Sequence, residues 1–275
     1  MIGLRPLIAA AGVFLIAGCA SVPNPHSRIL VNEIVSPYEA GVTKIRVLLP
    51  EHMERGKSYA VVYLLPVEAF DGNHWGDGLA EVEKSGLAAR YPVIFAEPTF
   101  SFIPWYADHP SDPLMRQESY LLHAVLPFVE RRYPARRDRD GRLLLGFSKS
   151  GWGAFSLMLR HPQVFGKASA FDSPLMMGDL KRGFTRGIFG TQQNFARYQV
   201  SRLLTARASL FHSENRFAVL GYHGFRHDLQ GAHALMQRLE IVHRYEDGPE
   251  RDHTWESGWL PDAVAFLVSG TDGAR

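Results

Sequence analysis

Short runs of apolar and β-branched residues recur along the chain and predict strands. Residues 44–49 (KIRVLL) alternate apolar with polar positions, whereas residues 59–65 (YAVVYLL) form a nearly continuous apolar run. A continuous run of this length is typical of a strand that is buried on both faces. Further strands are predicted at 93–96, 142–146, 167–171 and 217–221, with a weaker candidate at 241–245.

Amphipathic helical patterns separate these strands. Between residues 118 and 132, Leu121, Val125, Phe128 and Val129 share one helix face, and Pro127 predicts a kink or a restart. Residues 151–160, 228–240 and 260–268 have similar faces. Alternating strands and helices predict an α/β fold, a mostly parallel sheet with helices on both faces. Residues 178–212 break the alternation, and we interpret them as an insertion over one sheet edge within a single domain, 28–275.

The first residues of the chain predict export. Arg5 precedes an apolar run at 7–17, which is too short to span a bilayer but suits a signal peptide. Residues 16–19 (IAGC) resemble the bacterial lipobox, in which the chain is cut before the cysteine and the cysteine is lipidated. We therefore expect a signal peptide at 1–18, a lipid on Cys19 and a tether at 19–27. Ala20 favours the outer membrane, facing the periplasm, by resemblance to Gram-negative sorting.

Composition then narrows the classes of function. The 30 Lys and Arg against 28 Asp and Glu give a net charge of +2, and this balance gives no reason to expect nucleic-acid binding. The single cysteine, Cys19, excludes an intramolecular disulfide and a Cys-rich metal site. A lipidated Cys19 would leave the mature chain without a free thiol. The search for a nucleophile therefore turns to serine.

The strongest chemical signal lies in residues 142–161 (RLLLGFSKSGWGAFSLMLRH). A buried strand runs into Gly146, Ser148 and Ser150, and an apolar-faced helix follows at once. This is the strand–turn–helix setting of a G-x-S-x-G nucleophile elbow, with Ser150 in place of the last glycine. An elbow presents the Ser148 hydroxyl at a helix N-terminus, where backbone N–H groups stabilise a developing negative charge.

A serine nucleophile needs a base and an acid, which follow it in the order acid, then histidine, in this type of fold. His253 lies in a polar loop after the last predicted strand and is the expected base. Asp228, after the strand at 217–221, is the expected acid, although it could instead cap the following helix. Asp172, after the strand at 167–171, is the alternative acid.

With these residues, the chain resembles the esterase D-like (putative esterase) family of α/β-hydrolases. That family includes S-formylglutathione hydrolases, feruloyl esterases and mycolyltransferases. The resemblance covers about residues 43–268 and is most specific at GFSKSGWGAFSLMLRHPQVFG, with WYAD at 105–108 and HTW at 253–255 also similar. It implies an α/β-hydrolase fold without an organic cofactor, acting on small-molecule carboxylic esters or related acyl groups.

The resemblance also places an oxyanion-hole donor in the loop after the third strand. Many members have His-Gly there, whereas this chain has Pro66, Val67 and Glu68. Because Pro66 has no N–H, the donor would be Val67 or Glu68, and Lys149 would supply the second N–H. A carboxylate at Glu68 would oppose catalysis unless it points away or is protonated.

Trp105 and Tyr106 either pack on the sheet edge or line an acyl pocket at the carboxyl ends of the strands. No metal is expected, because residues 71–77 match a calcium loop poorly and His223 and His227 lack a helical metal-site pattern. We therefore expect a lipid-anchored serine esterase that forms an acyl-enzyme on Ser148. An acyltransferase using the same intermediate and a non-catalytic envelope scaffold remain alternatives.

Overall fold

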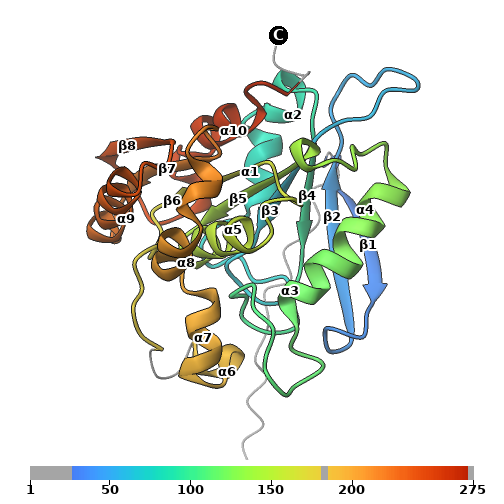
Figure 1. Ribbon diagram of the computed structural model, residues 1–275. Coiled ribbons are helices and arrows are strands. Elements are labelled where there is room, and N and C mark those ends of the chain that lie inside the picture. The colour runs from blue at the N-terminus through green and yellow to red at the C-terminus, as the bar shows by residue number, and fades with distance from the viewer. Residues whose placement is uncertain (1–26, 181–184, 272–275) are drawn as a thin grey trace, which may run out of the picture.

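A central sheet organises the computed structural model, which describes residues 27–180 and 185–271 (Figure 1). Its eight strands within these residues lie in the order β1-β2-β4-β3-β5-β6-β7-β8. Their bounds are β1 (Leu30–Val35), β2 (Val42–Leu48), β3 (Val61–Leu65), β4 (Ile94–Pro98), β5 (Arg142–Phe147), β6 (Lys167–Phe171), β7 (Phe217–Tyr222) and β8 (His243–Glu250). The pairs β1–β2 and β2–β4 are antiparallel and the others are parallel, which confirms the predicted α/β-hydrolase fold class.

Helices cover both faces of this sheet (Figure 1). One face is covered by α1 (Gly78–Lys84), α2 (Leu87–Arg90) and α10 (Leu260–Val268). The other is covered by α3 (Gln117–Tyr120), α4 (Leu126–Arg132), α5 (Lys149–Arg160), α8 (Val200–Arg207) and α9 (Arg226–Arg238). Each face has its own hydrophobic core, because side chains alternate between the two sides of a strand.

Strand β3 shows why the central strands are continuously apolar. Val61, Tyr63 and Leu65 enter the core under α5, and Val62 and Leu64 enter the core under α10. All five side chains are fully buried. A strand between two helical layers has no solvent-facing side, so its sequence shows no polar alternation.

The helix predicted at 118–132 contains an irregularity. It consists of α3, a π-helical turn at Leu121–Val125 and α4 in direct succession. Pro127 lies in the first turn of α4, where it cannot donate to the carbonyl four residues earlier. The π-helical turn absorbs this missing hydrogen bond without ending the helix.

The segment at 178–212 lies between β6 and β7. Its described residues form α6 (Arg186–Phe189), α7 (Gln192–Tyr198), α8 and a short 3₁₀ helix at Ala208–Phe211. Phe189, Phe195 and Tyr198 belong to the core on the α5 side of the sheet. The segment therefore packs over α5, whereas the sequence analysis placed it over a sheet edge.

The expected signal peptide and Cys19 lie outside the described residues. Among the helices that the structure describes, none combines the length and the apolar character needed to cross a bilayer.

Candidate active site

Ser148 directly follows strand β5 and lies at the carboxyl edge of the parallel sheet. The strand ends at Phe147, Ser148 adopts φ 53° and ψ −132°, and α5 begins at Lys149. A positive φ is costly for a residue other than glycine, and such strain is concentrated at functional sites. The backbone thus makes the sharp strand-to-helix turn that is expected of a nucleophile elbow.

Gly146 and Ser150 shape this turn. A β-carbon on Gly146 would lie 2.2 Å from the backbone oxygen of Ser150, so a larger residue does not fit. The buried Ser150 hydroxyl accepts a hydrogen bond from the Phe147 N–H (2.9 Å) and donates one to the Phe147 carbonyl (2.8 Å). Ser150, which replaces the last glycine of the motif, therefore stabilises the turn through hydrogen bonds to the backbone of Phe147.

Asp172 follows the neighbouring strand and lies beside the elbow. In the parallel pairing of β5 with β6, Phe147 is opposite Phe171, and the Ser148 N–H donates to the Phe171 carbonyl (3.1 Å). The Asp172 side chain is buried, and its Oδ2 contacts Nδ1 of His253. A base and its carboxylate therefore meet at the strand adjoining the one that carries the serine.

Two influences on the pKa of Asp172 oppose each other. Burial raises its pKa, but hydrogen bonds from His253 and from the backbone N–H groups of His223 and Phe225 lower it. The balance holds the pKa of Asp172 below its ordinary value, so the group is a carboxylate at neutral pH. A carboxylate on Nδ1 fixes the imidazole tautomer that leaves Nε2 free to accept a proton.

The position of Asp172 corrects the expected acid, Asp228. Asp228 lies in the first turn of α9, and its Oδ1 accepts the backbone N–H of Met176 at 3.0 Å. Asp228 thus ties the segment after β6 to α9, while Asp172 holds His253. The sheet order explains the difference, because β6 lies directly beside β5 and β7 is one strand further away.

His253 lies among three aromatic rings. Its ring centroid is 4.5 Å from that of Phe147, 5.0 Å from that of Trp75 and 5.7 Å from that of Phe225. Among the described residues, the Ser148 hydroxyl makes no hydrogen bond. Bonds between nucleophile and base are often long in the absence of substrate and tighten when it binds.

Trp75 is a site residue that the sequence analysis missed. Its carbonyl accepts hydrogen bonds from the Thr254 hydroxyl and from the Trp255 N–H, both at 3.0 Å. These bonds tie the loop after β3 to the loop that carries His253. No spacing or motif in the sequence indicates this contact, because the two loops are far apart along the chain.

Unpaired backbone N–H groups lie beside the elbow. Within the part of the chain that the structure describes, the N–H groups of Val67, Glu68 and Lys149 have no hydrogen-bond acceptor. The Glu68 carboxylate accepts the Trp75 N–H at 3.4 Å, within its own loop. Burial lowers the pKa of the Lys149 ammonium, and attraction to Glu68 opposes that shift.

Trp105 and Tyr106 do not line a substrate pocket. They are only 6% and 0% exposed and belong to the core on the α5 side of the sheet. The Trp105 ring packs edge-on against Trp152 of α5, with centroids 5.6 Å apart. Of the two interpretations of this aromatic pair, packing is therefore the correct one.

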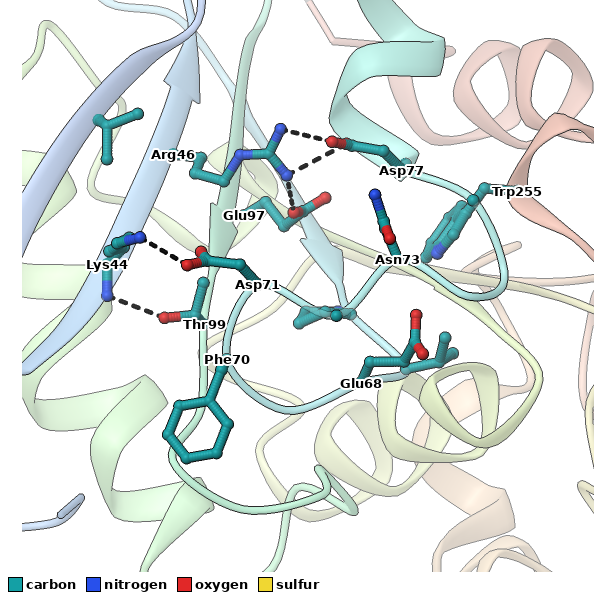
Figure 2. Close-up of a pocket in the computed structure, with 16 residues that line it drawn as sticks. Lys44, Arg46, Glu68, Phe70, Asp71, Asn73, Asp77, Glu97, Thr99 and Trp255 are labelled. Carbon is teal, nitrogen blue, oxygen red and sulfur yellow. Dashed lines mark hydrogen bonds and ion pairs between the residues drawn. The ribbon is translucent and has the colours of Figure 1, made fainter. Parts of the chain in front are cut away.

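A cavity of about 440 Å³ is lined in part by residues 66–68 of the loop after β3 (Figure 2). The basic groups in its wall are paired, because Lys44 contacts Asp71 at 2.6 Å and Arg46 contacts both Asp77 and Glu97 at 2.7 Å. With Glu68, the wall holds four carboxyl groups against these two basic groups. In the described residues, no group of three or more His, Cys, Asp or Glu side chains could hold a metal ion.

The fold and this arrangement of groups define an α/β-hydrolase of the esterase type. The family model described as Putative esterase matches residues 38–255, and the chain belongs to this family.

Relatives and solved structures agree with this class. Esterase MT1326 and Esterase Rv1288, from two strains of Mycobacterium tuberculosis, are each 27% identical over 146 residues, 51% of this chain but only 30% of theirs. The match thus spans less than a third of the length of each of these relatives.

Among solved structures, FphF, a fluorophosphonate-binding serine hydrolase of Staphylococcus aureus, has a TM-score of 0.71 at 17% identity, covering 87% of this chain and 98% of its own. A ferulic acid esterase has a TM-score of 0.68 at 18% identity, covering 87% and 95%. Both structures share the fold.

Proposed function

We propose that this protein is a serine esterase that cleaves small-molecule carboxylic esters through an acyl-enzyme on Ser148. The observation that carries the proposal is the Asp172–His253 pair at the end of the strand adjoining the Ser148 elbow. A strained serine, an oriented imidazole and unpaired N–H groups together supply a nucleophile, a base and oxyanion donors.

The reaction follows from the placement of these groups. Nε2 of His253 takes the Ser148 proton as the serine oxygen bonds to the ester carbonyl carbon, and Asp172 stabilises the resulting imidazolium. The N–H of Lys149 and one from the 66–68 loop bind the oxyanion. His253 then gives the proton to the leaving alcohol. A water molecule, deprotonated by His253, hydrolyses the acyl-enzyme and restores the serine.

Labelling with a fluorophosphonate probe tests this proposal. The wild type should be labelled and Ser148→Ala should not. Ser169→Ala is a matched control, because Ser169 is buried in β6 and its hydroxyl has no hydrogen-bond partner among the described residues. This control should be labelled like the wild type. A wild-type protein that neither reacts with the probe nor hydrolyses p-nitrophenyl esters would refute the proposal and favour a non-catalytic scaffold.

We also propose that the enzyme is a lipoprotein of the bacterial envelope, anchored through Cys19. The lipobox-like residues 16–19 support this proposal. Fractionation of cells that express the wild type or Cys19→Ser tests it, because the variant should move from the membrane to the soluble fraction. Equal membrane partitioning of the two proteins would contradict a lipid anchor.

A further inference from the structure

The Tyr106 hydroxyl lies in the core and holds the loop after β3. It donates a hydrogen bond to the Pro66 carbonyl at 2.5 Å. Pro66 is the first residue beyond β3, and Val67 and Glu68, the candidate oxyanion donors, follow it. Tyr106 thus contacts the backbone of the loop that carries the candidate oxyanion donors.

The hydrogen bond to Pro66 also fixes the direction of the next N–H group. The cis peptide bond among the described residues is Gly248–Pro249, so the Pro66–Val67 bond is trans. In a trans peptide the carbonyl and the N–H are coplanar and point in opposite directions. A hydroxyl that holds the Pro66 carbonyl on one side therefore holds the Val67 N–H on the opposite side.

Strand pairing brings the loop that begins at Pro66 to the same edge of the sheet as the nucleophile. In the parallel pairing of β3 with β5, Leu65 is opposite Gly146. Val67 lies two residues beyond Leu65, and Ser148 lies two residues beyond Gly146, so both residues follow the carboxyl ends of adjacent parallel strands. The Val67 N–H has no acceptor in the described part of the chain, as expected of a group that binds an oxyanion.

Tyr106 is itself rigidly held. It is fully buried, its backbone has φ 56°, and its N–H donates to Oε1 of Gln117 at 3.0 Å. Its ring lies directly on α5, where a β-carbon on Gly153 would come within 2.1 Å of it. The ring therefore cannot swing away, and the phenol hydroxyl is a fixed point for the loop.

We propose that Tyr106 is a positioning residue for the oxyanion hole, and that it selects the Val67 N–H, rather than that of Glu68, as the donor from this loop. This inference rests on the proposed esterase function and deepens it. In this arrangement the buried Tyr106 affects binding of the transition state indirectly, because its hydroxyl orients the planar Pro66–Val67 peptide group. It also explains how a loop that begins with proline supplies a well-directed donor.

Tyr106→Phe tests the inference, because it removes only the hydroxyl. With p-nitrophenyl butyrate, we expect kcat to fall about 10- to 100-fold, less than the loss on deleting an oxyanion donor, because the N–H is misdirected and not removed. KM should stay unchanged. The Ki of a trifluoromethyl ketone, whose adduct places an oxyanion in the hole, should rise by the factor by which kcat/KM falls.

Two matched controls separate positioning from loss of structure. Tyr120→Phe also removes a hydrogen bond of a buried phenol, in that case to the Thr43 hydroxyl at 2.9 Å. Tyr63→Phe removes a buried hydroxyl that has no partner among the described residues. Both should keep kcat and Ki at wild-type values.

Several outcomes would overturn the inference. These are a wild-type kcat in Tyr106→Phe, an unchanged Ki beside a lower kcat, or an equal loss in Tyr120→Phe. If the wild type hydrolyses esters and the fluorophosphonate probe labels Ser148, such results refute the role of Tyr106 alone and leave the esterase intact.

A second variant covers the case in which Tyr106→Phe does not fold. Replacing Tyr106 with 4-aminophenylalanine keeps a weaker donor in the same place. A partial loss of kcat at unchanged KM, with a matching rise in Ki, supports the inference. A wild-type kcat or a changed KM contradicts it.

Discussion

Asp172 and Asp228 have similar settings in the sequence but different contacts in the molecule. Each comes after a buried strand, Asp172 directly after β6 and Asp228 in the first turn of α9, the helix that follows β7. Asp172 contacts Nδ1 of His253, whereas Asp228 accepts a backbone N–H from Met176. At the scale of single residues, the role of a carboxylate is set by the partner that its strand brings within reach.

Amide substitution distinguishes these two carboxylates. Asp172→Asn should lower kcat by about 10³- to 10⁴-fold, because a neutral amide no longer holds the required tautomer or stabilises the imidazolium. Asp228→Asn should keep kcat close to wild type, because an amide oxygen can still accept the Met176 N–H. Steady-state hydrolysis of a p-nitrophenyl ester measures both values. The reverse ranking would restore Asp228 as the acid.

The elbow between β5 and α5 is built by close backbone packing. Gly146 admits the Ser150 carbonyl where a side chain would otherwise stand, and Ser150 bonds back to both polar backbone groups of Phe147. Gly153, one turn further along α5, lets the helix lie against Tyr106. At the scale of elements, small residues set the distance between the strand, the helix and the loop that Tyr106 holds.

Gly146→Ala should destabilise the whole elbow. The added β-carbon would meet backbone atoms that a rotamer change cannot move, so we expect a loss of at least about 3 kcal/mol in the free energy of unfolding. Gly178→Ala is the control, because a β-carbon there would meet nothing within 4 Å. Urea unfolding compares the two variants. A Gly146→Ala protein as stable as the control would show that the turn is not tightly packed.

Buried carboxylates influence the stability of the molecule as a whole. Burial raises the pKa of Glu39 to about 7, although hydrogen bonds from Ser101 oppose the shift. Burial also raises the pKa of Glu97 to about 7 against the attraction of Arg46. Between about pH 4.5 and 7 the folded state retains protons that the unfolded state has released. Each group therefore lowers stability as the pH rises through this window.

Glu39→Gln should remove the Glu39 part of this pH dependence. The amide carries no charge, so the variant should match the wild type near pH 4 and exceed it at pH 8, by up to about 3 kcal/mol. Thermal unfolding at several pH values measures the difference. Glu33→Gln, at an exposed position of β1, is the control and should show no such trend. A constant difference between Glu39→Gln and wild type at all pH values would exclude titration of Glu39 as the cause.

The sequence by itself determined the fold class and the elbow. Parallel strands between two helical layers must be apolar on both sides, and a sharp strand-to-helix turn needs small residues at fixed spacing, so both features are local and visible in the sequence. It also indicated His253, from a polar loop after the last strand.

Only the tertiary structure decided which distant groups meet. The order of strands in the sheet brings Asp172 to His253, and the tie between two loops brings Trp75 to the same ring. The contact from Tyr106 to Pro66 likewise joins segments whose spacing in the sequence carries no sign of it. Periodicity reports which side of an element is buried, and it does not report which neighbour buries it.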